Sequence, residues 1–546
     1  MKTKISTLII VSFILFGLFD ISNYVQAQAS IKWHFDMKDA SYGQSAAADI
    51  DGDGKLEIVF GCYRNDSSIY ALNAENGSLL WKFNAGTTFA EGCNDVAPII
   101  YDVDGDGQLD VIVPGSCNPK TFCFNGADGT LKWVANTRGS DSPPTIADID
   151  GDGKPEIIHG EFGGYVICLN GEDGSIAWEI AVDTDSWIQT APTIADVNND
   201  GNLDIIVGTW NAVDKTKNTL RAYTASTQQL LWSFPVNDVM YHGTAVGDLD
   251  KDGMLELVFG NYNDTLYCLN ANNGTVKWKY TAGASFYVGS PVVLADVNND
   301  GNCDVIFNAW YKMIALNGDG TLLWEYDIPN YGQSFRGAAI SDINNDQYPD
   351  VIFGTDNGMV IGLNGNNGSL IFNTNLRTDY GDSLYSAQHA PLVADFDNDG
   401  ILDVFIAGGH GVIPFENNFG RAYMLSIGQG NGPDWLMFQN DIRRQSNVCN
   451  NGNTSLPETG NRQLQYFIYP NPSKGDLRIY FEKGNSNDFF ISLSDITGKR
   501  LELASYELVN TSEIAYKMSL VDGLYFMKIT DKRTGQSTTE KLIIKR

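Results

Sequence analysis

The chain has 546 residues, a hydrophobic fraction of 43% and a formal net charge of −31. This length exceeds what one hydrophobic core normally serves, so two or more folded units are expected, and a charged fraction of only 19% argues against wholesale disorder. The negative charge argues against nucleic-acid binding, because phosphate recognition needs a basic surface. From residue 455 onward 13 Lys and Arg stand against 11 Asp and Glu, so the acidity belongs to the region before it.

Residues 1–29 have the layout of a secretory signal peptide. Lys2 and Lys4 precede an apolar run from Ile5 to Phe19, and small residues follow as far as Ala29. No later segment approaches the roughly 20 apolar residues that a membrane-spanning helix needs. The sequence therefore predicts an exported protein with no membrane span in the mature chain.

Residues 30–448 contain an internal repeat built around an aspartate-rich loop, as in ADIDGDGKLEIVFG. The interval between loops is 46 to 53 residues, which is about the length of a four-stranded propeller blade. The eight loops begin at Asp49, Asp102, Asp148, Asp196, Asp248, Asp296, Asp342 and Asp395.

Each repeat reads as four short strands, with the acidic loop between the first two and a Gly turn before the last. The fourth strand follows the pattern LNAENGSLLW and carries an aromatic residue in register, at Trp81, Trp133, Trp178, Trp232, Trp278, Trp324 and Phe372. The eighth repeat lacks this strand, whereas a spare copy, SIKWHFDM, precedes the first repeat. Pairing of that N-terminal strand into the last sheet would remove an exposed edge. We expect an all-β fold, an eight-bladed β-propeller with seven blades as the alternative, followed by a small β-sandwich.

The loops resemble the FG-GAP or VCBS repeats of integrin-type propellers, and the LNxxxGxxxW segments resemble the blades of quinoprotein (PQQ-like) propellers. Both resemblances recur along residues 31–448. They imply a propeller fold and bring no catalytic residues with them.

The loops match the needs of Ca²⁺, which takes six to eight oxygen ligands. Each offers side-chain oxygens at positions 1, 3, 5 and 9, whereas an EF-hand needs its bidentate carboxylate at position 12. Solvated turns are the alternative, but eight loops in phase favour several structural calcium ions. The predicted ligands are Asp49, Asp51, Asp53, Glu57, Asp102, Asp104, Asp106, Asp110, Asp148, Asp150, Asp152, Glu156, Asp196, Asn198, Asp200, Asp204, Asp248, Asp250, Asp252, Glu256, Asp296, Asn298, Asp300, Asp304, Asp342, Asn344, Asp346, Asp350, Asp395, Asp397, Asp399 and Asp403.

The seventh loop departs from the others at position 6, where Gln347 replaces glycine. Since that turn favours a positive φ, which costs a residue with a side chain roughly 1–2 kcal/mol, we expect this site to be the weakest.

Eight cysteines in an exported chain raise the question of disulfides. The sequence pattern places Cys123, Cys168, Cys268 and Cys303 as small buried core residues. Of the remaining four, Cys62, Cys93, Cys117 and Cys449, the pair Cys93 and Cys117 is favoured because both lie in one repeat, and the connectivity stays open.

Two groups of residues are candidates for ligand binding on the face opposite the acidic loops. His242, Arg336 and His389 each stand six residues before a loop, near the expected central channel; hydration of the channel mouth is the simpler interpretation. Trp210 and Trp310 each stand six residues after a position-9 carboxylate, and Trp187 lies in a connection on the same face. Such rings suit stacking on sugars or anchoring a protein, although packing between blades explains them equally well.

After a predicted linker at residues 449–465 the repeat ends. Residues 466–546 contain YPNPSKGDLRIYF, ISLSDITGKRL and LVDGLYFMKIT, short strands with Gly turns that predict a β-sandwich. These segments closely resemble the type A sorting domain of the type IX secretion system. The resemblance implies export across the outer membrane, followed by release or attachment to the cell surface.

The favoured function is a non-catalytic recognition or adhesion scaffold for extracellular glycan or protein. The alternative is an extracellular polysaccharide-degrading enzyme, since calcium-loaded propellers also occur among rhamnogalacturonan lyases, with His242 or His389 as base beside Arg336. A redox quinoprotein ranks third, because no cofactor residues are recognisable.

Overall fold

The computed structural model describes residues 29–86, 92–94, 96–283, 287–412 and 417–449, and beyond these the strands between 466 and 544 with a few adjoining residues. The predicted signal peptide and linker lie outside the described residues, apart from Ala29 and Cys449. Within the described residues, no helix combines the length and the apolar character that crossing a bilayer requires.

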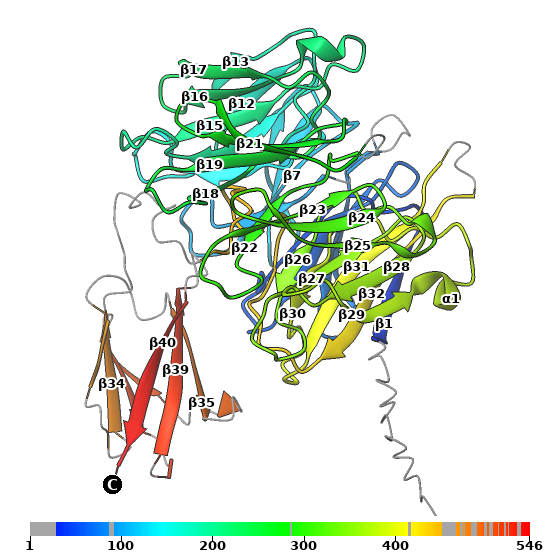
Figure 1. Cartoon of the computed structure of the whole chain (residues 1–546). Helices are drawn as coiled ribbons and strands as arrows, with labels where there is room; N and C mark the ends of the chain where they lie inside the picture. Colours follow the sequence, from blue (N-terminus) through cyan, green and yellow to red (C-terminus); the bar gives the residue numbers. More distant parts are fainter. Residues whose placement is uncertain are drawn as a thin grey trace, which may run out of the picture.

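In this part of the chain, residues 30–428 form eight four-stranded antiparallel sheets (Figure 1). Their first strands are β2 (Ser45–Ala48), β6 (Ile99–Tyr101), β10 (Thr145–Ala147), β14 (Thr193–Ala195), β18 (Ala245–Gly247), β22 (Val293–Ala295), β26 (Ala339–Ser341) and β30 (Leu392–Ala394). Their second strands are β3 (Glu57–Gly61), β7 (Asp110–Pro114), β11 (Glu156–Gly160), β15 (Asp204–Gly208), β19 (Glu256–Gly260), β23 (Asp304–Ala309), β27 (Asp350–Gly354) and β31 (Leu402–His410).

The outer half of each sheet follows the same order. The third strands are β4 (Ser68–Asn73), β8 (Lys120–Asn125), β12 (Tyr165–Asn170), β16 (Thr219–Thr224), β20 (Thr265–Asn270), β24 (Lys312–Asn317), β28 (Met359–Leu363) and β32 (Phe419–Gly428). The fourth strands are β5 (Leu79–Asn84), β9 (Leu131–Asn136), β13 (Ile176–Ala181), β17 (Leu230–Pro235), β21 (Thr275–Thr281), β25 (Leu322–Asp327), β29 (Leu370–Asn375) and β1 (Ser30–Met37).

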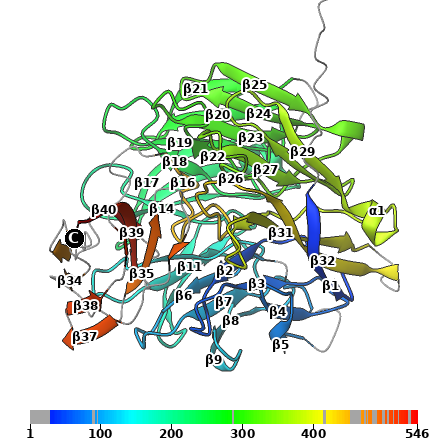
Figure 2. The ribbon, with the colours of Figure 1, turned by 90° about the horizontal axis from the view of Figure 1, so that it is seen from below.

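The first strands surround a common centre (Figure 2). β2 contacts β6 on one side and β30, the first strand of the last sheet, on the other. The N-terminal strand β1 pairs antiparallel with β32, from Ser30 opposite Ser426 to Met37 opposite Gly420. The predicted closure of the last sheet by the N-terminal strand is therefore confirmed, and the eight sheets fit the eightfold repeat.

The Gly and Trp of the LNxxxGxxxW pattern join neighbouring sheets. The Trp81 indole donates a hydrogen bond of 2.6 Å to the Gly126 carbonyl in the next sheet. Its ring packs on Gly129, where a Cβ would lie only 2.7 Å from the ring and where the φ of 69° also favours glycine. Trp33 repeats this contact across the ring closure, donating to the Ala74 carbonyl at 2.8 Å. The Gly and Trp positions of the repeat therefore form contacts between neighbouring sheets.

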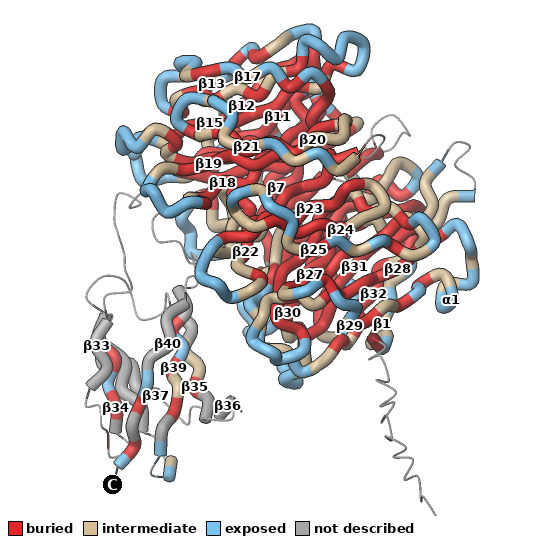
Figure 3. Tube along the Cα trace, in the orientation of Figure 1, coloured by how far each residue is buried: buried red, intermediate tan, exposed pale blue. Residues whose placement is uncertain are grey.

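The packing of neighbouring sheets against one another buries the inner strands. Every residue of β3 is buried, because the strand is covered on both faces by adjacent sheets. Figure 3 shows the inner strands buried and the connections exposed, and the outer strands, such as β13 and β21, are largely exposed or intermediate. The described helices lie in connections: α1 (Leu376–Tyr380) and two 3-10 helices, η2 (Lys215–Lys217) and η3 (Pro329–Tyr331).

Residues 429–449, which we call the inner segment, wind around the inside of the ring. Backbone amides of six first strands, and of the residue directly after a seventh, donate to its carbonyls, from Ala47, Ile146, Ile194, Val246, Leu294, Val393 and Asp342. Each carbonyl satisfies an amide that would otherwise face the channel. The inner segment thus links seven of the described sheets.

Two side chains of the inner segment fill the centre. Phe438 packs against Ala97, Ala191 and Ala390, which precede the first strands of three different sheets. Arg444 is fully buried, and its guanidinium donates to the carbonyls of Pro144 at 2.9 Å and of Phe438. Burial lowers the pKa of Arg444 to about 10. A filled centre leaves no open channel at this level of the ring.

The disulfides confirm one prediction and correct another. Cys93 is bonded to Cys117, as expected. Cys303 is bonded to Cys449, so the prediction that Cys303 is a simple core residue was wrong. The sequence could not reveal this pair, because the inner segment brings Cys449 back to the sixth sheet across 146 residues. Cys62, Cys123, Cys168 and Cys268 are buried thiols.

The C-terminal part has two further four-stranded antiparallel sheets. One contains β33 (Tyr466–Tyr469), β34 (Asp476–Phe481), β38 (Glu513–Lys517) and β37 (Tyr506–Asn510); the other contains β36 (Arg500–Leu501), β35 (Phe489–Asp495), β39 (Gly523–Asp531) and β40 (Ser537–Ile544). Leu477 and Ile479 of one sheet share a buried core with Leu493, Met527 and Ile529 of the other.

Candidate metal loops and the opposite aromatic face

The acidic loops connect the first strand of each sheet to the second, so all of them lie on one face of the ring. In the first loop, Asp49 accepts hydrogen bonds from the amides of Gly52 at 2.8 Å and Gly54 at 3.0 Å. Glu57 at position 9 accepts from the Ile50 amide at 2.9 Å. Backbone amides thus hold the carboxylates at the first and the last ligand position of the loop. The loop folds back on itself, and its carboxylates come close together.

The same gathering recurs around the ring. Carboxylate oxygens within 4.8 Å of one another come from three acidic residues in each of five loops: Asp49, Asp51 and Asp53; Asp102, Asp104 and Asp110; Asp148, Asp150 and Glu156; Asp248, Asp250 and Glu256; and Asp395, Asp397 and Asp399. Three loops carry Asn198, Asn298 or Asn344 at position 3, which offers an amide oxygen in place of a carboxylate.

The carboxylates at position 9 are buried at the base of the loops. Burial raises the pKa of Glu57 and of Asp350 to about 8, and the pKa of Asp204 and of Asp304 to about 7, with the neighbouring aspartates adding to the rise. Glu57, Asp204 and Asp304 each keep one buried oxygen without a hydrogen-bond partner. A hard cation is the ligand that such oxygens suit.

Position 6 of the loops adopts the left-handed conformation. Its φ is 88° at Gly54 and 85° at Gly107, and Gln347 is held at 75° in the seventh loop. The expected strain at Gln347 is therefore present in the backbone.

The opposite face carries aromatic rings over the sheets from β10 to β25. The Trp210 ring lies 5.5 Å from Tyr241 and 4.9 Å from Tyr262, and Tyr262 lies 4.0 Å from Tyr287, all between ring centroids. Trp310 joins through Tyr287 at 6.0 Å. Trp210 and Trp310 are thus half-buried members of one ring cluster. We call the side of the propeller that carries this cluster the aromatic face.

Trp187 lies at the edge of this cluster. Its amide donates to the Trp210 carbonyl at 2.9 Å, and the Trp210 amide donates back at 2.8 Å. The Trp187 ring packs on Phe162 at 4.8 Å, yet the side chain remains 47% exposed. Trp187 can therefore present a flat apolar surface to a ligand.

A groove of about 360 Å³ lies beside Trp310. Tyr311 contacts Trp310 at 5.5 Å and Tyr331 at 5.8 Å, and Tyr331 is 81% exposed. Polar groups of Lys312, Asp327 and Asn330 complete the lining with Ile328. Sequence reasoning missed Tyr311 and the polar lining; only the adjacency of Tyr311 to Trp310 offered a signal.

The three residues predicted near the channel separate into two places. His242 and Arg336 line one cavity together with Asp141, Gln189 and Tyr241, but its volume is about 10 Å³, barely enough for one water molecule. His242 is buried, and burial together with Arg336 lowers its pKa well below the usual value.

His389 is buried elsewhere. Its ring packs on Phe405 at 6.1 Å, and its Nδ1 lies 2.8 Å from the Ala390 carbonyl oxygen. The two histidines are therefore positioned by packing, and the exposed aromatic residues are the more accessible candidates for ligand contact.

Comparison with known families agrees with this architecture. Residues 49–113, 102–159 and 148–207 match the FG-GAP-like repeat. Residues 216–435 match the family described as outer membrane protein assembly factor BamB, and residues 467–545 match the secretion system C-terminal sorting domain. The chain thus combines FG-GAP-like repeats, a PQQ-like propeller region and a sorting domain, and the sorting domain indicates secretion through the type IX secretion system.

Similarity to individual proteins is more limited. Cartilage acidic protein 1 of Xenopus tropicalis is 36% identical over 80 residues, which cover 13% of this chain and 12% of that protein. Rhamnogalacturonan endolyase YesW of Bacillus subtilis is 24% identical over 144 residues, covering 24% and 22%. The crystal structure of the V. cholerae biofilm matrix protein Bap1 superposes with a TM-score of 0.54 at 15% identity, covering 76% of this chain and 94% of that one, a likeness of fold alone.

Proposed function

We propose that this chain is a secreted, calcium-binding, eight-bladed propeller that acts as a non-catalytic recognition scaffold for extracellular glycan. Calcium ions in the acidic loops stabilise the ring, and the aromatic face holds the ligand. A protein ligand on the same face is the alternative partner.

The donor set supports calcium. Each loop offers only oxygen atoms, in the number and type that Ca²⁺ prefers, and buried oxygens of Glu57, Asp204 and Asp304 have no hydrogen-bond partner. A bound cation would compensate both the missing hydrogen bonds and the repulsion among adjacent carboxylates. Because these loops lie on the face opposite the aromatic residues, calcium serves the fold and not the ligand.

The observation that carries the recognition proposal is the groove between Tyr311 and Tyr331. It combines accessible ring faces with hydrogen-bonding groups of Lys312, Asp327 and Asn330. A sugar ring has the same two characters, apolar faces and a polar edge, so the groove and the exposed Trp187 suit a chain of sugar units. The description of Bap1 as a biofilm matrix protein is compatible with such a role.

The similarity to rhamnogalacturonan endolyase YesW favours a second candidate, a polysaccharide lyase. The arrangement of the candidate base argues against it, since His242 is buried beside a cavity of about 10 Å³ and the inner segment fills the ring centre. A base must reach within hydrogen-bond distance of its substrate proton.

One screen separates these functions. The exported chain with its calcium is incubated with pectic, plant and algal polysaccharides, and both binding and unsaturated products are measured. Binding without products supports the scaffold. Unsaturated products would establish the lyase, and failure to bind any glycan would leave a protein as the ligand.

A further inference from the structure

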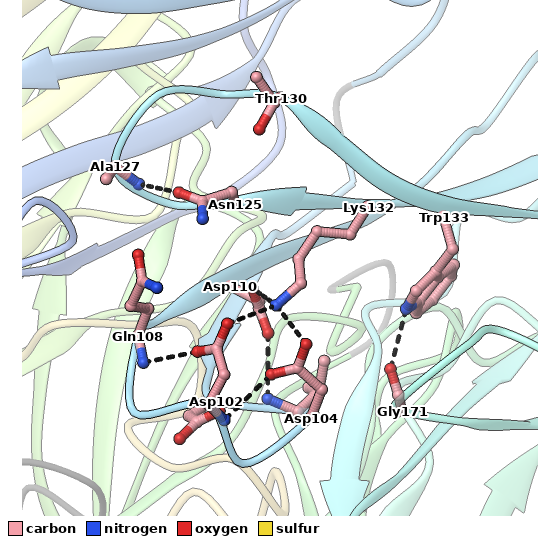
Figure 4. A network of polar contacts seen from close by, with 12 residues as sticks. Asp102, Asp104, Gln108, Asp110, Asn125, Ala127, Thr130, Lys132, Trp133 and Gly171 are labelled. Carbon is pink, nitrogen blue, oxygen red and sulfur yellow. Dashed lines mark hydrogen bonds and ion pairs between the residues drawn. The ribbon is translucent and has the colours of Figure 1, made fainter.

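Three of the eight acidic loops already contain a cation from the protein itself. Figure 4 shows Lys132 of β9 reaching into the second loop, where its Nζ lies 2.5 Å from Asp104, 2.9 Å from Asp110 and 3.3 Å from Asp106. These are ligand residues at positions 3, 9 and 5. The ammonium group therefore lies among the oxygens predicted to hold calcium.

Lys277 and Lys32 repeat this arrangement. Lys277 Nζ lies 2.5 Å from Asp250 and 2.7 Å from Glu256 in the fifth loop. Lys32 Nζ lies 2.5 Å from Asp397 and 3.1 Å from Asp403 in the eighth loop.

A single sequence position in the fourth strand determines which loops contain a lysine side chain. Each of the three lysines immediately precedes the aromatic residue of the fourth strand, at Trp33, Trp133 or Trp278, so its side chain enters the loop of its own sheet. The other five sheets carry an apolar residue there: Leu80, Ala177, Leu231, Leu323 and Ile371.

In all three loops that contain a lysine, the lysine forms an ion pair with the position-9 carboxylate. Asp110 and Glu256 pair with lysine through one oxygen and with a backbone amide through the other. In three of the five loops without lysine, Glu57, Asp204 and Asp304 keep a buried oxygen that has no hydrogen-bond partner, whereas both oxygens of Asp350 accept from backbone amides. Asp403 is intermediate, because it contacts Lys32 through one oxygen while its other oxygen has no hydrogen-bond partner.

We propose that Lys32, Lys132 and Lys277 replace calcium in the eighth, second and fifth loops, so that five of the eight loops bind the ion. This inference rests on the proposed calcium binding. Calcium bonds to oxygen at 2.3–2.6 Å in a shell of six to eight ligands, so it cannot share the site with an ammonium group held by the same oxygens. Lysine and calcium are therefore alternatives in these loops.

The assignment has a structural consequence. Lys32 belongs to β1, the strand that closes the ring by pairing with β32. An internal cation in that loop keeps the closing strand attached when calcium is scarce. Calcium then stabilises the five sheets whose loops bind it, without controlling closure.

The stoichiometry of calcium tests the assignment. The exported chain is equilibrated by dialysis at about 1 mM free calcium, the range in which extracellular modules bind, and calcium per chain is measured by atomic emission. We expect about five ions. Lys132→Leu and Lys277→Leu, which install the residue found at this position in other sheets, should each add one ion.

Two further variants complete the design. Lys279→Leu is the matched control, because Lys279 lies on the same strand as Lys277 with its Nζ 4.8 Å from the Tyr267 ring centroid, and it should leave the stoichiometry unchanged. Ala177→Lys places a lysine at the exposed equivalent position of the third sheet and should remove one ion. Its result stands even where a leucine variant fails to fold.

Eight ions in the unmodified chain, or variants that change nothing, would overturn the lysine assignment and leave the calcium proposal intact. No bound calcium in any variant would instead overturn the calcium proposal.

Discussion

The two faces of the ring differ in how they use the repeat. On the loop face, the same ligand positions recur in all eight sheets, from Asp49 to Asp403. On the opposite face, the ring cluster around Trp210 and Trp310 and the groove lie on the sheets from β10 to β25, with different residues on each. Separate ring contacts, such as Tyr42 with Tyr63 and Tyr380 with Phe419, occur on other sheets. Repeated residues hold sheets together, because every sheet needs the same support, whereas a ligand needs one local surface. Residues that depart from the repeat are thus the better indicators of recognition.

Removal of calcium, which acts through the loop face, should lower the stability of the ring more than any other change considered below. A ligand that binds only the folded state at 100 times its Kd adds about 2.7 kcal/mol per site, so chelation should lower the Tm by roughly 10 °C or more. Differential scanning calorimetry at constant ionic strength measures the shift, and added calcium should reverse it. An unchanged melting curve in metal-stripped protein would refute a structural role for the loops.

The inner segment lies inside the ring, between the two faces. The substitution Phe438→Ala tests whether this segment contributes to the hydrophobic core. The side chain is buried against alanines of three sheets, so its loss should reduce the free energy of unfolding by about 3–5 kcal/mol. Val213→Ala, at a side chain that is 99% exposed, is the control for denaturant unfolding. Equal midpoints for the two variants would show that the segment contributes little.

The loop face should also respond to pH once calcium is removed. Burial raises the pKa of Glu57 to about 8 and of Asp204 to about 7, so these folded carboxyls hold protons that the unfolded chain has released above about pH 5. Stability falls with rising pH wherever the folded state binds more protons. We expect the Tm of chelated protein to fall as the pH rises from about 5 and to level off once it passes about 8.

The calcium-loaded protein is the control for this pH series. It shares every other titrating group, but its loop carboxylates are already ionised, so its Tm should change less. A parallel fall in both forms would assign the pH dependence to groups outside the loops.

On the aromatic face, substitutions should weaken binding without changing calcium-dependent stability. Trp187→Ala with Tyr331→Ala removes two exposed rings and should weaken glycan binding at least tenfold, about 1.4 kcal/mol. Trp210→Ala with Trp310→Ala should weaken binding as much, but because both rings are half-buried it should also lower the Tm. Isothermal titration with calcium present measures both pairs, and normal binding by the exposed pair would place the ligand elsewhere.

The smallest effect concerns the irregular loop. Gln347→Gly relieves a φ of 75° and should raise the free energy of unfolding by about 1 kcal/mol, with tighter calcium binding in the seventh loop. Gly301→Gln is the converse substitution in the sixth loop and should cost a similar amount. A crystal grown in limiting calcium in which the seventh loop fills first would contradict the strain argument.

The sequence alone determined whatever is local or periodic. The eightfold loops, the register of the Gly and Trp positions and the return of the N-terminal strand to the last sheet all follow from patterns within one repeat or from a missing copy of it. Cys93 and Cys117 lie 24 residues apart in one repeat, so their disulfide could also be predicted. Each of these features depends on contacts between residues of one repeat or of adjacent repeats, whose relative positions follow from the period.

Only the tertiary structure decided the features that join distant residues without a period. The inner segment accepts hydrogen bonds from seven sheets at irregularly spaced carbonyls of its own, so its sequence shows no repeat that would predict them. Cys449 meets Cys303 because of the path of this segment. Tyr311 and Tyr331 form a groove through the connection that follows β25. Lys132 lies at a β-bulge between the pairs Trp133 with Cys123 and Leu131 with Phe124, and only the folded sheet shows that its side chain reaches the loop. The contacts of the inner segment arise when the ring closes, since the closure brings together residues whose spacing along the chain carries no signal. The groove and the lysine depend instead on how the strands and connections of individual sheets are folded.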